Sequence, residues 1–107
     1  MRKIFNGFRY DSDTADKIGK ADNLSRGVDS VTDFNYWEAT LYRTRKAKRF
    51  FLVGTGGAMT RYGKQIGQSS FAGGSKLEPL TDEEARLWAE EYLTAVEIEA
   101  AFEVQDA

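Results

Sequence analysis

Two aromatic-rich segments joined by a short basic link constrain the fold of this chain more than any other feature. Residues 34–43 (FNYWEATLYR) and 49–54 (RFFLVG) contain mainly residue types that favour β-strands. The five residues between them, from Thr44 to Lys48, are few enough to form a hairpin turn. The sequence therefore predicts two antiparallel strands with a basic tip.

Alternation along the first of these strands separates its side chains onto the two faces of a sheet. One face carries Tyr36, Glu38, Thr40 and Tyr42. The other face carries Trp37, Ala39, Leu41 and Arg43. We expect the second face to be the side that contacts the core.

The N-terminal part predicts a second hairpin and a short helix. Residues 2–10 contain Asn6-Gly7 between two short apolar runs, and both residue types accept the positive φ angles of a two-residue turn. Residues 12–22 predict a helix, because three small or apolar residues recur there at helical spacing. Residues 23–33 predict a polar loop.

The segment 54–74 is unusually rich in glycine, with seven of the ten glycines of the chain. We expect tight turns here, with a short helix over residues 58–66. The segment lacks a phosphate-loop motif, because Gly63-Lys64 is followed by Gln65 rather than by serine or threonine. Structural turns are the favoured interpretation, and binding of a small ligand or phosphate is the alternative.

The clearest helix signal lies near the C-terminus, over residues 82–93. Thr81 and Glu84 form a capping-box pattern in front of an apolar stripe. The helix continues or restarts after Thr94 and runs to about Phe102.

These elements together predict an α+β fold in a single domain spanning residues 1–107. We expect an antiparallel sheet of three to five strands, covered by the C-terminal helix and one or two short helices. Residues 75–80 supply an edge strand, because Pro79 has no N–H to donate.

Charge is distributed very unevenly along the chain. Residues 1–76 contain fourteen basic and seven acidic residues, a net charge of +7. Residues 77–107 contain one basic and ten acidic residues, a net charge of −9. Such a split predicts two electrostatically distinct surfaces.

The basic hairpin tip is the strongest candidate for a partner-binding surface. Its cations are Arg43, Arg45, Lys46, Lys48 and Arg49, and Arg61 and Lys64 join them if the following loop folds back. A two-stranded ribbon with such cations can contact phosphates. A solvated turn, or pairing with the acidic helix of the same molecule, is the alternative.

The acidic helix is a weaker candidate surface, represented by Glu83, Glu90 and Glu91. An ordinary solvated helix face is the favoured interpretation there. Trp37, Trp88 and their aromatic neighbours can form a stacking platform for nucleobases. Their spacing favours a role in the core for Trp88 and Phe51, and less so for Tyr36 and Tyr42.

The chain has no cysteine and no histidine, which excludes disulfides, zinc–thiolate sites, cysteine nucleophiles and histidine general bases. No complete catalytic motif is present, so we expect neither an enzyme nor a bound cofactor or metal. The N-terminus lacks the apolar run of a signal peptide, and no segment approaches the roughly 20 apolar residues of a membrane span. A cytoplasmic protein is the expectation.

Several segments together resemble a family of small proteins encoded by bacterial mobile elements and prophages. The resemblance spans about residues 4 to 102 and rests on FNGFRYDSDTADKIG, DFNYWEATLYRT, FFLVGTGGAMTRYG and GGSKLEPLTDEEARLWAEEYL. It implies a cytoplasmic protein of bacterial or phage origin with no catalytic residues to transfer. Small proteins in that setting often inhibit or modulate host machinery, including CRISPR defence.

We therefore expect a non-catalytic binding protein that inhibits or modulates a host macromolecular complex, with an anti-CRISPR role as one form. The expected partner is a host protein or nucleoprotein complex, and no membrane is involved. Direct nucleic-acid binding through the basic tip is one alternative. Binding of a small ligand or phosphate by the glycine-rich segment is the other.

Overall fold

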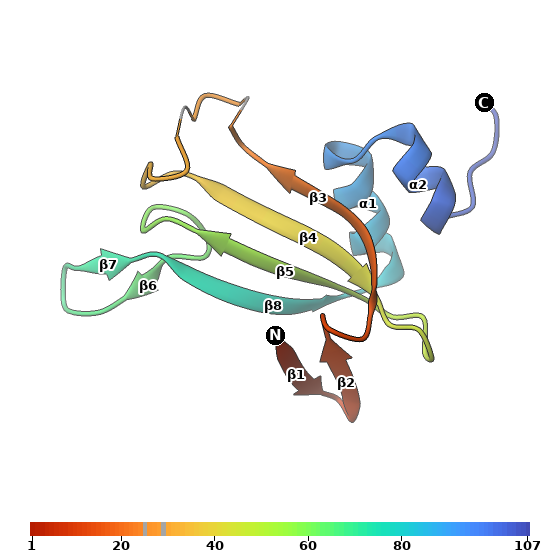
Figure 1. Ribbon diagram of the computed structural model, residues 1–107, viewed down its shortest axis with the longest axis horizontal. Helices are drawn as coiled ribbons and strands as arrows, with labels where there is room; N and C mark the ends of the chain where they lie inside the picture. The colour runs from red at the N-terminus through yellow and green to blue at the C-terminus, as the bar shows by residue number, and fades with distance from the viewer. Residues whose placement is uncertain (25, 29) are drawn as a thin grey trace.

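A four-stranded antiparallel sheet with the order β3-β4-β5-β8 forms the centre of the molecule (Figure 1). The computed structural model describes residues 1–24, 26–28 and 30–107. The strands of this sheet are β3 (Asp16–Asp22), β4 (Trp37–Arg43), β5 (Phe50–Gly56) and β8 (Gly74–Leu80). Because β8 lies at the edge, the prediction of an edge strand containing Pro79 is confirmed.

Two small hairpins form separate two-stranded sheets beside the central sheet. The first pairs β1 (Arg2–Phe5) with β2 (Phe8–Asp11), and the second pairs β6 (Lys64–Gln65) with β7 (Phe71–Ala72). In the first hairpin, Asn6 and Gly7 have φ angles of 50° and 80°, as a mirror-image two-residue turn requires. The predicted N-terminal hairpin is therefore confirmed.

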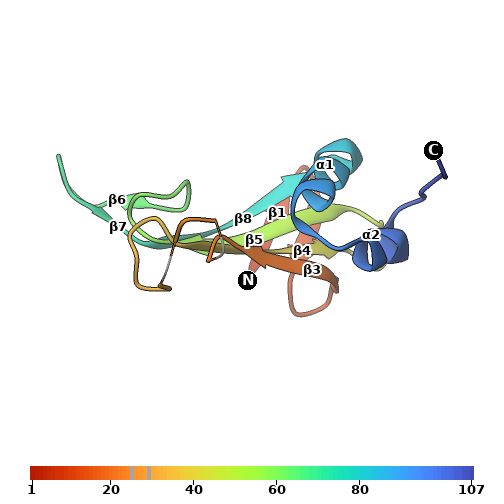
Figure 2. The ribbon, with the colours of Figure 1, turned by 90° about the horizontal axis from the view of Figure 1, so that it is seen from above.

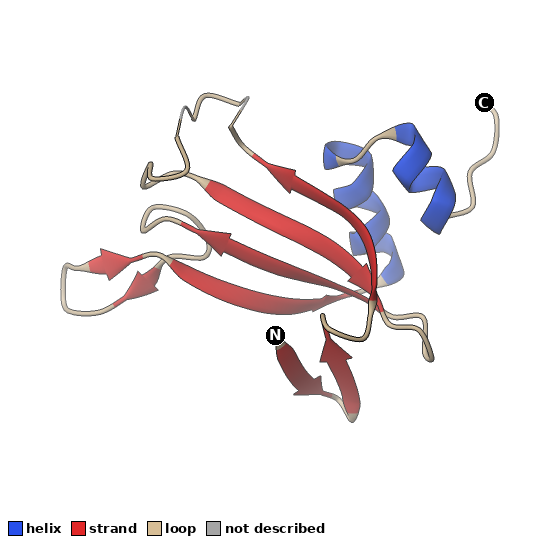
Figure 3. Ribbon diagram, in the orientation of Figure 1, coloured by secondary structure: helices blue, strands red, loops and turns tan. Residues whose placement is uncertain are grey.

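Both helices follow the last strand and lie at one end of the sheet (Figure 3). They are α1 (Asp82–Tyr92) and α2 (Ala95–Ala101). Each begins with a complete capping box, Thr81 with Glu84 and Thr94 with Glu97. The predicted C-terminal helix therefore restarts at Thr94 rather than continuing, and the α+β fold class is confirmed.

The core on the helix side of the sheet is formed where α1 packs against residues of β4 and β5. Figure 2 shows α1 above one face of the sheet. Ala39 and Leu41 face this side, as the alternation of β4 predicts, and both are fully buried. Ala85 and Ala89 of α1 are equally buried, so small side chains let the helix approach the sheet closely.

A second, smaller core lies on the opposite face of the sheet and anchors the N-terminal hairpin. Tyr10 of β2 is 3% exposed and packs edge-on against Phe51 of β5, with ring centroids 5.6 Å apart. Tyr42 stacks on the same phenylalanine at 5.2 Å. Leu77 of β8 completes this cluster. Both faces of the sheet therefore bury aromatic or aliphatic side chains.

The predicted helix over residues 12–22 is wrong, because most of this segment is strand β3. The strand pairs with β4 along its length, with a bulge between Lys17 and Gly19 that disturbs simple alternation. A side chain at Gly19 would lie 2.7 Å from Leu93 Cδ2. Glycine weakens a helix and here lets Leu93 contact the strand, so tertiary pairing outweighs the weak helical spacing.

The predicted helix over residues 58–66 is also wrong. Two successive turns replace it, in which Thr60 N–H donates to the Gly57 carbonyl and Gly63 N–H donates to the Thr60 carbonyl. Gly63 passes so close to the Ala58 carbonyl that a Cβ atom would overlap it. The prediction of tight turns is thus confirmed. The predicted polar loop 23–33 contains residues 25 and 29, which lie outside the described residues.

Candidate functional site

The basic hairpin tip faces the N-terminal hairpin across a cleft of about 590 Å³. Its lining residues are Gly7, Phe8, Arg9, Asp11, Thr14, Thr44, Arg45, Lys46, Ala47 and Arg49. We call this the basic cleft, because four of these side chains are cations and only one is acidic. Two hairpins distant in sequence therefore combine their positive charges.

The tip itself is a closed turn at the end of β4 and β5. Thr44 N–H donates to the Arg49 carbonyl at 2.8 Å, and Arg49 N–H donates to Thr44 Oγ1 at 2.9 Å. Lys48 has a φ of 57°, a left-handed conformation that turns the chain back toward β5. The backbone thus fixes where the cations of the turn begin and end.

Two of the cleft arginines are held by neighbouring side chains. The Arg49 guanidinium lies 3.8 Å from the centroid of the Phe8 ring, close enough for a cation–π contact. Arg45 Nε donates to Asp16 Oδ1 at 2.9 Å, in an exposed ion pair. Exposed pairs of this kind contribute only about 0–1 kcal/mol, so a competing anion can displace Asp16 at little cost.

Arg9 and Lys46 complete the positive charge of the cleft. Both side chains are exposed, and neither forms an ion pair within residues 1–24, 26–28 and 30–107. Their charges are therefore free to interact with a ligand. Sequence reasoning missed Arg9, because its hairpin meets the basic tip only in the folded molecule.

The remaining cations of the predicted tip point elsewhere. Arg43 faces the helix side of the sheet, where its Nη1 donates to the Ala101 carbonyl at 3.0 Å. Arg43 and Lys48 line a separate depression together with the acidic side chains of Asp82 and Glu103. The structure thus divides the predicted site, and part of its charge does face acidic residues of the same molecule.

Arg61 and Lys64 do not join the tip. Arg61 forms an ion pair with Glu78 on the helix side of the sheet, while the cleft lies on the other side. Lys64 belongs to β6, beyond the far end of β5 (Figure 1). The seven residues of β5 span roughly 20 Å, which separates Lys64 from the tip. The condition for their joining the tip, a loop that folds back toward it, is therefore not met.

The acidic candidates lie on α1. Glu83 and Glu90 are exposed and two turns apart, so they share one helix face. Glu91 forms an ion pair with Arg26 at 3.1 Å, and its carbonyl accepts from the same guanidinium. Glu83 and Glu90 form no ion pair among the described residues, so they carry the unpaired charge of this surface.

The aromatic candidates differ in burial. Phe51 is fully buried, which confirms its predicted role in the core. Trp88 packs against the core but stays half-buried. Tyr36 is buried, and its hydroxyl donates to Glu38 Oε2 at 2.8 Å. Burial and this hydrogen bond raise the pKa of Tyr36 to about 12, so the hydroxyl stays neutral.

No helix among the described residues is long and apolar enough to cross a membrane. Comparison of the chain with protein-family models, with curated proteins and with solved structures finds no match.

Proposed function

We propose that this protein is a non-catalytic binding protein that acts on a host nucleoprotein complex, and that its basic cleft contacts the phosphate backbone of nucleic acid in that complex. The observation that supports this proposal is the meeting of Arg9, Lys46 and Arg49 in one cleft. These cations come from two separate hairpins, so their grouping is a property of the fold.

The chemistry of the cleft suits phosphates better than isolated carboxylates. Guanidinium groups donate two parallel hydrogen bonds to a phosphate, and lysine adds a mobile point charge. Phosphates of a nucleic acid recur at regular spacing, so several of the cations can be used together. A ribbon-like hairpin tip is also narrow enough to enter a groove of a duplex.

The overall charge of −2 does not oppose such binding. At physiological salt the Debye length is about 8 Å, so distant charges are strongly screened at the cleft. The acidic α1 lies on the other side of the sheet from the cleft. A phosphate in the cleft therefore interacts mainly with the local cations.

A direct test is the affinity for short fluorescein-labelled double-stranded DNA, single-stranded DNA and RNA, measured by anisotropy. The double variant Lys46→Gln/Arg49→Gln should bind roughly tenfold more weakly at low salt, because two phosphate contacts lose their charge. The matched control is Lys64→Gln/Lys76→Gln, which removes the same charge from exposed positions outside the cleft. Equal losses in both variants, or no binding by the native protein, would contradict the proposal.

The resemblance to proteins of mobile elements suggests a CRISPR effector as one host complex. The protein should then block target-DNA binding or cleavage by the effector, and Lys46→Gln/Arg49→Gln should weaken the block. Unchanged interference across the common effector types would remove this form of the proposal.

A second candidate mode uses the acidic face of α1, where Glu83 and Glu90 flank Leu87, which is 56% exposed. Such a face can occupy a basic groove on a host protein. Capture of a host protein that is lost in Glu83→Gln/Glu90→Gln, but kept in Lys46→Gln/Arg49→Gln, would favour this mode over the basic cleft.

A further inference from the structure

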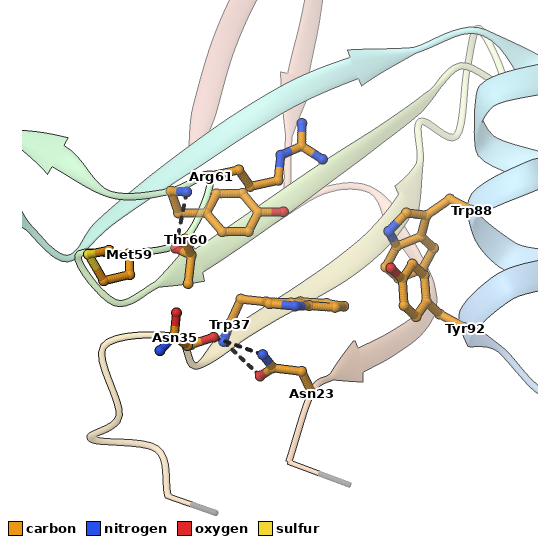
Figure 4. Close-up of a pocket in the computed structure, with 9 residues that line it drawn as sticks. Asn23, Asn35, Trp37, Met59, Thr60, Arg61, Trp88 and Tyr92 are labelled. Carbon is orange, nitrogen blue, oxygen red and sulfur yellow. Dashed lines mark hydrogen bonds between the residues drawn. The ribbon is translucent and has the colours of Figure 1, made fainter. Parts of the chain in front are cut away.

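A second cleft, of about 470 Å³, lies on the helix side of the sheet (Figure 4). Its aromatic walls are Trp37, Tyr62, Trp88 and Tyr92. We call it the aromatic cleft. Side chains from β4, from the glycine-rich loop and from α1 meet here, so the cleft exists only in the folded chain. Its volume lies within the range of small-molecule sites, about 300–1,000 Å³.

Two glycines of β5 let the loop that follows it pack closely as one wall of the aromatic cleft. A Cβ atom at Gly54 would overlap the ring of Tyr62, and one at Gly56 would overlap the side chain of Thr60. Both side chains can therefore lie directly on the backbone of β5. Close packing therefore explains these glycines without any role in phosphate binding.

Both tryptophans of the chain border this cleft and both are only half-buried. Tyr92 supports them: its ring centroid lies 5.2 Å from Trp37 and 5.1 Å from Trp88. Figure 4 shows the Trp37 ring edge-on, with Asn23 on one side and Thr60 and Arg61 on the other. Aromatic surface therefore remains available for stacking after the core is complete.

The aromatic cleft offers several hydrogen-bond donors. Among the described residues no side-chain hydrogen bond involves either indole N–H, since the bond between Trp37 and Asn23 uses the backbone N–H of Trp37. The Trp88 nitrogen faces the middle of the cleft (Figure 4). Burial raises the pKa of Tyr62, so its hydroxyl stays protonated and able to donate. Arg61 adds guanidinium N–H groups beside its ion pair with Glu78, and none of the residues that line the cleft is acidic.

We propose that the aromatic cleft binds a nucleobase as part of a mononucleotide. Stacking walls favour a planar ring, and unpaired donors favour a ring that is rich in acceptors, as purines and pyrimidines are. A quaternary ammonium ligand also suits aromatic walls, but it has no acceptor for the indole and phenol donors, and no lining carboxylate would balance its charge. This site is independent of the basic cleft, which lies on the opposite face of the sheet.

Intrinsic tryptophan fluorescence reports on this cleft directly, because both tryptophans border it. Titration with AMP, GMP, CMP and UMP should give saturable quenching with at least one of them. Ribose 5-phosphate and choline should give none. No saturable change with any nucleotide, or equal quenching by ribose 5-phosphate or choline, would overturn the proposal.

Variants then locate the binding, measured by calorimetry. Trp88→Phe keeps a ring in place but removes the indole, and should lower the nucleotide affinity roughly tenfold. Met59→Glu changes a cleft side chain that is 69% exposed, so folding should not suffer, and its negative charge should also lower the affinity roughly tenfold.

The control is Lys46→Gln/Arg49→Gln, in the basic cleft, which should leave nucleotide affinity within about twofold of the native value. Loss of nucleotide binding in this control, with full binding in Met59→Glu, would assign the nucleotide to the basic cleft and overturn the proposal. A failure of nucleic-acid binding by the basic cleft leaves these measurements and their interpretation unchanged.

Discussion

The two ends of β5 support two different kinds of surface. At its start, near Phe50, the turn carries exposed cations and meets the N-terminal hairpin. At its end, Gly54 and Gly56 have no side chains, which lets the side chains of Tyr62 and Thr60 pack directly on the strand. The first surface depends on charge, and the second depends on close approach of the backbone.

This difference has consequences for mutation. Exposed cations contribute little to stability, so the basic end should tolerate charge changes and lose only binding. Residues in close packing have no such freedom, so the glycine-rich end should lose stability first. The variants below test this difference in stability between the two ends of β5, in order of decreasing expected effect.

Tyr10→Ala should destabilise the protein by about 3 kcal/mol, because it removes the ring that anchors the N-terminal hairpin on Phe51. The basic end therefore still depends on one buried contact. Urea denaturation measures the loss, with Ile4→Ala as the control on the same hairpin, where the side chain is 63% exposed. Similar losses in both variants would mean that the hairpin is not anchored by Tyr10.

Gly54→Ala should cost about 2 kcal/mol, because the added methyl group overlaps the buried ring of Tyr62. Gly67→Ala, in the same segment, is the matched control, since its nearest neighbour would lie at an ordinary 3.7 Å. Thermal unfolding measures the stability of both variants, and only Gly54→Ala should unfold at a clearly lower temperature than the native protein. A stable Gly54→Ala protein would show that Tyr62 moves freely and that the glycine is not needed for packing.

Thr81→Ala should cost about 1 kcal/mol, because it removes the hydrogen bond to the Glu84 N–H at the start of α1. Thr94→Ala removes the equivalent bond from α2, which has no fully buried residue, and should cost less. Chemical denaturation ranks the two. The reverse order would mean that α2 contributes more to the fold than α1.

Acid should weaken the same capping box. The Thr81 N–H donates to the Glu84 carboxylate. This hydrogen bond, together with a smaller contribution from the Thr81 side chain, holds the pKa of Glu84 below its ordinary value of 4.5. The folded state therefore gains stability above the unfolded pKa and loses it as the pH falls through the lower folded pKa. Unfolding of Glu84→Gln between pH 5 and about 2 should show a smaller loss than the native protein. An identical loss in both proteins would contradict this assignment.

Local signals in the sequence were enough for much of the fold. Asn6-Gly7 favours the two-residue turn of the first hairpin, and the Thr81 capping box marks the start of α1. Pro79 restricts β8 to the edge of the sheet. The helix predicted around Gly19 is wrong, because the weak helical spacing there competes with pairing to β4. Only the folded chain makes that contact.

The candidate site was less predictable than the fold. The sequence predicts the cations of the tip, but Arg9 joins them only through the anchor of Tyr10 on Phe51. Arg61 lies away from the tip because the turns after Gly57 place it beside Glu78. Both outcomes depend on contacts between residues far apart in the chain, and spacing along the sequence contains no information on them.

The central claim is that the basic cleft releases counterions from a phosphate backbone. The most direct measurement is the slope of the logarithm of the nucleic-acid binding constant against the logarithm of salt concentration. Each phosphate contact contributes about 0.7–0.9 to this slope, so Lys46→Gln/Arg49→Gln should flatten it by about 1.5, with Lys64→Gln/Lys76→Gln unchanged. A slope that is the same in all three proteins, or a chain that binds no nucleic acid at low salt, would contradict the account.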